Sequence, residues 1–173
     1  MTTAAAPPLL PRTCAELRDT LAAVVACNAV GGVGALSSSS AVREWLPTLD
    51  RPPYQPPGWV FGPVWTVLYT TMGMSITAVR RVQSGDGARR ARAQRLFAVQ
   101  LVVNALWSFL FFTRRNPRVA LVDAGVIVAA VAATVRAIWA VHRPAALLLL
   151  PYLAWVSFAF VLNADIVRRN PGR

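Results

Sequence analysis

The sequence has no lysine, a single histidine and two cysteines, and these absences exclude several kinds of site. Cys14 and Cys27 lie in segments of different character, so the chain has no Cys/His cluster of the kind that binds zinc. His142 stands beside Arg143 and Pro144 in a short connection, which favours an interfacial role over ligation of an iron. We find no nucleophile with a partner base, no phosphate-binding loop and no paired carboxylates. The sequence therefore lacks the residue combinations on which conventional enzyme catalysis depends.

Charged residues are scarce and mostly of one sign. Only 14% of the residues are charged, 18 of them basic and 7 acidic, which gives a formal net charge of +11. Hydrophobic residues make up 55% of the chain, and the mean hydropathy is +0.47. This composition is too apolar for a soluble domain. Nearly all the arginines lie between long apolar runs, a spacing that is typical of the flanks of membrane spans.

The basic charge could also indicate a nucleic-acid partner. Residues 80–95 contain six arginines but no aromatic side chain on which a base could stack. We therefore interpret this segment as a membrane flank that is attracted to anionic lipid, and we expect no nucleic-acid partner. The two sides of a five-span topology would carry nine and eight arginines, so the orientation stays open.

Five apolar runs are each about as long as the roughly 20 residues that a helix needs to cross a bilayer. The sequence predicts an all-α fold, an integral membrane bundle of five transmembrane helices between residues 20 and 168. The predicted helices span residues 20–38, 59–80, 95–112, 118–141 and 145–168. Residues 1–19 are predicted to be a flexible segment and residues 169–173 a basic tail. A cleaved signal peptide is the alternative for the first run, but Glu16 and Asp19 dilute its basic end. We expect a multi-pass protein of a bacterial cell membrane.

Aromatic and amide side chains recur at helical spacing inside three of these runs. The stripes are Phe61, Trp65, Tyr69, Met72 and Ile76; Gln100, Asn104, Trp107 and Phe111; and Tyr152, Trp155, Ala159 and Asn163. An unpartnered amide is costly in lipid, so Asn104 and Asn163 should face the bundle interior or a ligand. If these side chains only packed against one another, leucine could fill the same volume at lower cost than tryptophan and tyrosine. We therefore favour a cavity for a flat, mostly apolar molecule over packing among the helices, and packing remains the alternative.

A proline-rich stretch precedes the second run. Prolines at positions 52, 53, 56 and 57 remove backbone donors and fix φ, so residues 47–58 should form a stiff, extended segment over the mouth of the bundle. Trp45, Tyr54 and Trp59 should then lie at the level of the lipid headgroups. The prediction is a rigid aromatic lid beside an aromatic cavity, with Trp45 and Tyr54 contacting the ligand.

Four stretches between residues 45 and 163 carry a specific resemblance, and they follow one another in order: "RPPYQPPGWVFGPVWTVLYTTMG", "QLVVNALWSFLFF", "ALVDAGVIVAAVAATVRAIWAV" and "LLPYLAWVSFAFVLN". They resemble the signature blocks of the translocator protein family, also called tryptophan-rich sensory proteins or peripheral-type benzodiazepine receptors. The resemblance implies a five-helix membrane protein, often a homodimer, that binds tetrapyrroles. It implies protoporphyrin IX or haem as the ligand, with no covalently attached cofactor.

The resemblance also implies roles for individual residues. Trp65 and Trp155 match the pair of pocket tryptophans, Asn104 and Trp107 match a polar and aromatic wall, and Tyr69 and Ala159 match further pocket positions. The family's Lys-Pro-Ser-Trp is Arg51-Pro52-Pro53-Tyr54 here, which replaces an indole by a phenol at the lid. The sterol-recognition pattern at the end of the last helix is absent, so we do not predict high-affinity cholesterol binding.

Three functions from different classes remain open at this point. The first is a sensor or transporter that binds tetrapyrroles. The second is an enzyme that degrades the porphyrin in light, with Trp65 and Trp155 as the reacting indoles. The third is a structural membrane protein whose aromatic residues only pack.

Overall fold

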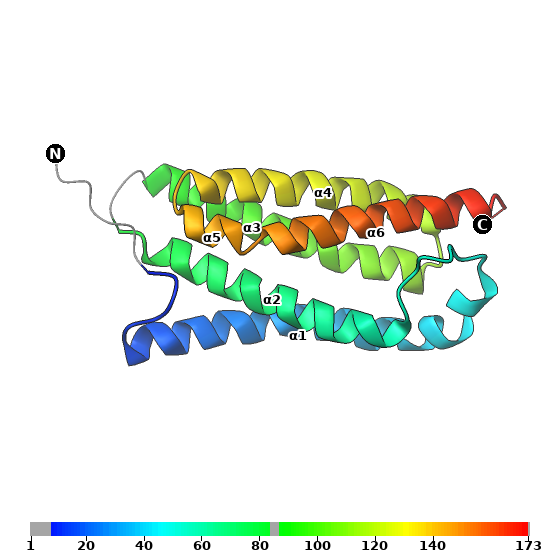
Figure 1. The fold of residues 1–173 in the computed structure, drawn as a ribbon, viewed down its shortest axis with the longest axis horizontal. Coiled ribbons are helices and arrows are strands. Elements are labelled where there is room, and N and C mark those ends of the chain that lie inside the picture. Colours follow the sequence, from blue (N-terminus) through cyan, green and yellow to red (C-terminus); the bar gives the residue numbers. More distant parts are fainter. Residues whose placement is uncertain (1–7, 84–86, 173) are drawn as a thin grey trace.

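In the computed structural model the described residues are 8–83 and 87–172, without the side chains of residues 37 and 38. The elements are α1 (Cys14–Glu44), the 3₁₀ turn η1 (Leu46–Thr48), α2 (Gly58–Arg81), α3 (Gly87–Ser108), the π-helical turn η2 (Phe109–Thr113), α4 (Pro117–Trp139), α5 (Arg143–Leu147) and α6 (Leu150–Arg169). The long helices run side by side along the long axis of the molecule (Figure 1). Closely packed pairs are α1 with α2, α3 with α4, and α4 with α6.

Four of these helical stretches are long and apolar enough to cross a membrane, and they make the chain a multi-pass integral membrane protein. They are Cys14–Leu36, Gly87–Thr113, Pro117–Trp139 and Arg143–Arg169, counted over the described residues. The predicted number of five spans is not confirmed, because α2 is not among the four. Glycine, threonine and serine interrupt the apolar residues of α2.

The first helix begins earlier than predicted. Residues 14–19 were expected in a flexible segment, but α1 starts at Cys14 and continues to Glu44. The side chain of Thr13 accepts a hydrogen bond from the backbone N–H of Glu16 (3.2 Å), and the Glu16 carboxylate accepts one from the N–H of Arg12 (2.6 Å). This arrangement is close to a capping box, which satisfies the free donors of a helix start. Residues 1–7 of the predicted segment lie outside the described residues.

The last predicted helix, over residues 145–168, is divided in two. α5 ends at Leu147 and α6 begins at Leu150, immediately before Pro151. A proline lacks the backbone N–H and its ring collides with the carbonyl four residues earlier, which here belongs to Leu147. The two pieces continue in nearly the same direction (Figure 1). The basic tail predicted from residue 169 begins one residue later, because Arg169 is the last residue of α6.

The extended segment predicted over residues 47–58 is shorter in the structure. Residues 47 and 48 belong to the 3₁₀ turn η1, and Gly58 is the first residue of α2. Residues 49–57 are not helical, as the prolines predicted, and one turn is closed by a hydrogen bond from the N–H of Gln55 to the carbonyl of Pro52 (3.1 Å). We call residues 49–57 the lid. It lies at the end of the bundle where α1, α3 and α6 end (Figure 1).

Glycine lets α1 and α2 approach closely. A Cβ added at Gly73 would lie 2.6 Å from Cα and 2.7 Å from the backbone nitrogen of Val24. Backbone atoms cannot rotate away as a side chain can, so the two helices would have to separate. Close approach through small residues is a main source of stability for helix pairs in lipid.

We expect Gly73→Ala to destabilise the protein by roughly 1–3 kcal/mol, because it overpacks the contact between α1 and α2. Gly62→Ala is the matched control on the same helix, since nothing lies within 4 Å of its added Cβ. The control should be neutral or stabilising by up to about 1 kcal/mol. Thermal unfolding of the detergent-purified proteins, followed by circular dichroism, measures both. Equal stability of the two variants would show that the contact does not limit helix packing.

Candidate ligand-binding site

Aromatic rings from α2 and α6 meet between these two helices. Phe61 and Trp155 are in edge contact with ring centroids 5.8 Å apart, and Trp65 and Tyr152 with centroids 6.2 Å apart. Trp65 also stacks on Tyr69 at 5.3 Å. We call this set the aromatic wall; its residues are Phe61, Trp65, Tyr69, Tyr152, Trp155 and Phe158. The separations are typical of favourable ring pairs.

A second ring cluster lies where α3 passes into η2. Trp107 stacks on Phe111 with centroids 5.0 Å apart, and Trp45 packs edge-on against the same Phe111 at 5.4 Å. The π-helical turn contains Phe111 and contributes Phe112 to the cluster, whose ring is 5.8 Å from that of Trp107. Turns of this kind are frequent at functional sites, because the extra residue changes the direction of the following side chains.

The amides between the helices are hydrogen-bonded to other helices. Asn104 of α3 donates to the hydroxyl of Tyr69 on α2 (3.1 Å). The indole N–H of Trp107 donates to Asn163 of α6 (3.2 Å), and the Asn163 amide donates to the carbonyl of Pro117 at the start of α4 (3.0 Å). These bonds remove the cost of burying polar groups. They also hold the helices that carry both ring clusters.

Among the described residues, one buried donor next to the aromatic wall has no partner. The hydroxyl of Tyr152 donates to Oε1 of Gln100 (3.1 Å), but Nε2 of Gln100 has no hydrogen bond within residues 8–83 and 87–172, although the residue is only 1% exposed. A buried donor without a partner costs free energy. It is a place where a polar atom of a bound molecule would be stabilised.

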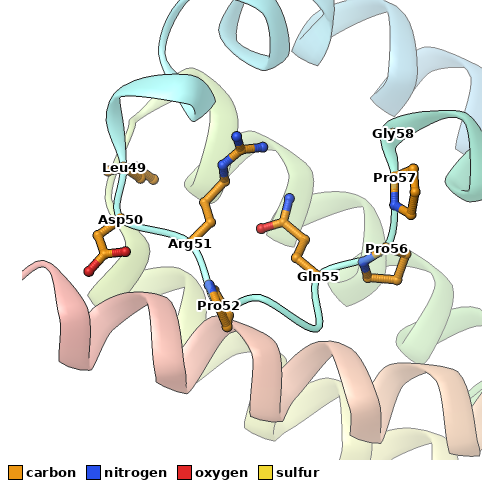
Figure 2. A pocket seen from close by; sticks show the side chains of 8 residues that line it. All are labelled: Leu49, Asp50, Arg51, Pro52, Gln55, Pro56, Pro57 and Gly58. Carbon is orange, nitrogen blue, oxygen red and sulfur yellow. The ribbon is translucent and has the colours of Figure 1, made fainter.

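The lid forms a cavity at the open end of the bundle. Its volume is about 400 Å³, within the range of roughly 300–1,000 Å³ typical of small-molecule sites. The residues around it belong to the lid and the first turn of α2 (Figure 2), and they are Leu49, Asp50, Arg51, Pro52, Gln55, Pro56, Pro57 and Gly58.

Polar contacts with the end of α6 fasten the lid. The N–H of Asp50 donates to the side-chain oxygen of Asn170 (3.1 Å), and the Asn170 amide donates to the carbonyl of Asp50 (2.9 Å). The hydroxyl of Tyr54 donates to Asp165 (3.2 Å). Partial burial, and then this hydrogen bond to a carboxylate, raise the pKa of Tyr54 above its usual value. We call these contacts the lid latch.

The stretch from residue 23 to residue 169 matches the model of the TspO/MBR family. The chain belongs to this family. It is 38% identical over 148 residues to the "Tryptophan-rich protein TspO" of Chlorobaculum tepidum, a match that covers 84% of this chain and 91% of that protein. It is 36% identical over 167 residues to the "Translocator protein" of Homo sapiens, covering 96% and 94% of the two chains. The "Tryptophan-rich sensory protein" of Cereibacter sphaeroides is 36% identical over 150 residues, covering 87% and 90%. The family resemblance seen in the sequence is confirmed.

Six of the eight predicted ligand-binding residues of this TspO/MBR protein take part in the two ring clusters and their hydrogen bonds. They are Trp45, Trp65, Tyr69, Asn104, Trp107 and Trp155. Tyr54 of the lid has its ring 6.4 Å from that of Phe158, at the edge of the aromatic wall. Ala159 is half-buried, one helical turn beyond Trp155 on α6. None of the eight lines the lid cavity, so their contact with a ligand stays a prediction.

Trp45, Tyr54 and Trp59 were predicted to lie at the level of the lipid headgroups, and the structure contradicts this for Trp45. Trp59 is 78% exposed and Tyr54 47% exposed, as expected of side chains at the surface. Trp45 is buried, because its ring packs against Phe111 inside the second cluster. In the residues that the structure describes, no group of three or more His, Cys, Asp or Glu side chains could hold a metal ion.

Sequence reasoning did not find the lid latch. Asp50 and Asn170 are 120 positions apart, and Tyr54 and Asp165 are 111 apart. Each is a common surface residue without a local pattern, so nothing in its neighbourhood indicates its partner. Gln100 was on the predicted stripe of α3, but the hydrogen bond that its oxygen accepts from Tyr152 depends on how α3 and α6 pack.

We expect Asn104→Leu to destabilise the protein by roughly 1–3 kcal/mol, because it leaves the buried hydroxyl of Tyr69 without its donor. Adding Tyr69→Phe removes that hydroxyl and keeps the ring, so the double variant should be no less stable than Asn104→Leu alone. A double-mutant cycle of thermal stabilities measures this coupling. Strictly additive effects would mean that the hydrogen bond contributes nothing.

We expect Asn170→Ala to loosen the lid without unfolding the helices, because it removes both hydrogen bonds to Asp50. The backbone amides of Asp50, Arg51, Tyr54 and Gln55 should exchange with solvent roughly ten-fold faster, whereas those in the middle of α4 keep their rates. Arg43→Ala is the control, since Arg43 is an exposed residue in the last turn of α1 and takes no part in the lid latch. Unchanged exchange in Asn170→Ala would show that other contacts hold the lid.

Proposed function

We propose that this TspO/MBR protein binds a tetrapyrrole, protoporphyrin IX or haem, against the aromatic wall and acts as a sensor or transporter of that ligand. The observation that carries the proposal is the set of rings that face one another from α2 and α6. Stacked aromatic side chains remove much of a flat apolar ring from water, and they do so without a specific hydrogen-bond pattern.

The packing of the helices supports this location. α2 packs most closely against α1, and in the described part of the chain its backbone makes at most sparse close contact with α6. Side chains therefore account for most of the contact between α2 and α6. Rings can move to other rotamers at low cost, so a flat molecule could enter between the two helices while the backbone stays in place. The hydrogen bonds of Asn104 and Asn163 hold the surrounding helices meanwhile.

The proposal includes α2 as a fifth span and a homodimer as the assembled form. α2 has 24 residues, which at about 1.5 Å per residue exceeds the roughly 30 Å of a hydrocarbon core. It also runs along the long axis of the bundle, packed against α1 and in contact with α3 (Figure 1). Light scattering of the detergent-purified protein measures the number of chains in a particle.

We expect protoporphyrin IX to quench the tryptophan fluorescence of the purified protein in a saturable way, at low micromolar concentration or below. Trp65→Leu should weaken binding at least ten-fold, because it removes a ring from the centre of the aromatic wall. Trp59→Leu is the matched control on the same helix, since Trp59 is 78% exposed. Its affinity should stay within a factor of two of the unmodified protein. Quenching that never saturates would contradict a binding site.

A further inference from the structure

The end of the bundle opposite the lid carries an arginine inside a membrane span. The start of α3, the end of α4 and the short helix α5 meet at this end (Figure 1). Arg136 lies in the last turn of α4, within the apolar stretch Pro117–Trp139, and it is exposed. A charge on the lipid-facing side of a span is costly unless its side chain reaches the membrane surface or meets an anion. Arg136 therefore needs a counter-charge at the membrane surface.

An exposed tryptophan marks the level of that surface. Trp139 follows Arg136 by three positions, so the two residues share a face of α4, and Trp139 is 45% exposed. Tryptophan is enriched where the hydrocarbon core meets the lipid headgroups. The guanidinium of Arg143, at the start of α5, lies 5.8 Å from the centre of the Trp139 ring, which is close enough for a cation–π attraction. The ring thus holds Arg143 at the headgroup level.

Two further arginines lie at the same height on α3. α3 packs closely against α4, and because the chain turns back between η2 and α4, the start of α3 lies beside the end of α4 (Figure 1). At about 1.5 Å per residue from this turn, Arg95 lies about 27 Å along α3 and η2, and Arg136 about 29 Å along α4. Arg92 shares the face of Arg95, and both are exposed. We call the five residues the basic patch; they are Arg92, Arg95, Arg136, Trp139 and Arg143.

No acidic side chain neutralises the basic patch within residues 8–83 and 87–172. The ion pairs in this part of the chain all involve Asp50 or Asp165, which lie at the lid end. Glu16 accepts a hydrogen bond from the N–H of Arg12 at the start of α1, and α1 packs chiefly against α2. The guanidinium groups of the patch are thus available to an anion from outside the chain. At the membrane surface the abundant anions are lipid headgroups.

We propose that the basic patch binds the phosphate of an anionic phospholipid. Each guanidinium presents its N–H donors in a planar fork, which can hold two phosphate oxygens at once. Trp139 contributes an amphipathic ring at the same level, and its contact with Arg143 orients one of the forks. A lipid bound here links the start of α3 to the end of α4. The site faces the surrounding bilayer, at the opposite end of the bundle from the lid.

Native mass spectrometry of the detergent-purified chain measures the binding of single lipids. Phosphatidylglycerol is anionic, whereas phosphatidylcholine carries the same phosphate but is neutral overall. We expect Arg136→Gln to bind phosphatidylglycerol roughly ten-fold more weakly than the unmodified protein does, with phosphatidylcholine unchanged. Arg43→Gln is the matched control, because it removes an equal charge from an exposed position in the last turn of α1, at the lid end. It should leave both affinities within a factor of two.

A second variant tests the site without changing the charge of the protein. Trp139→Leu removes the ring beneath Arg143 and keeps every arginine, so it should weaken phosphatidylglycerol roughly three-fold. Trp59→Leu replaces another exposed tryptophan, in the first turn of α2, and should have no effect on this lipid. An equal effect of the two replacements, or none, would mean that Trp139 does not belong to a lipid site.

The remaining outcomes also decide the proposal. Equal affinity of the unmodified protein for the two lipids would overturn it. Equal weakening by Arg136→Gln and Arg43→Gln would indicate general charge attraction and would overturn it as well. Inorganic phosphate is the third probe, and if it displaces phosphatidylglycerol at the same concentration, the patch takes free phosphate and not a lipid. If Arg136→Gln does not fold, Arg136→Lys, which keeps the charge but loses the fork, should weaken phosphatidylglycerol instead, and unchanged binding would contradict the site.

Discussion

The architecture depends on one constraint, which is that a polar group inside a lipid bilayer must find its partner within the protein. Three amide-bearing contacts meet it here. Asn104 joins α3 to Tyr69 of α2, Trp107 joins α3 to Asn163 of α6, and Asn163 joins α6 to the carbonyl of Pro117 on α4. Each bond specifies one arrangement of two helices, which packing among apolar side chains alone specifies less sharply. The aromatic wall is positioned by these bonds.

At the open end of the bundle this constraint is weaker, because polar groups there can form hydrogen bonds with water. The prolines of the lid have no donors that need partners, so an extended segment can cross the end of the bundle at little cost. It is held by a few contacts with the last turn of α6, chiefly those of Asn170 and Asp165. The lid is thus fastened by polar groups, whereas the wall beneath it is fastened by rings and buried amides. The helices that carry the wall are therefore held in place by buried hydrogen bonds, whereas the lid can separate from them when a few surface contacts break.

Much of this arrangement could be predicted from the sequence, because long apolar runs indicate membrane helices. The four-residue spacing of Phe61, Trp65 and Tyr69 predicted one face of α2, and that face is the one from which Phe61 and Trp65 reach α6. The start of α1 was missed because its capping residues precede the apolar run. The division between α5 and α6 could have been read from Pro151. The pairing of Asp50 with Asn170 could not, because residues 120 positions apart leave no local pattern.

The central proposal is that a flat ring lies against the wall between α2 and α6. An experimental structure of the protein with protoporphyrin IX tests it most directly. The account predicts the ring in contact with Trp65 and Trp155. Porphyrin found on the outer, lipid-facing surface near Trp59, with the rings of the wall still in contact with one another, would contradict it.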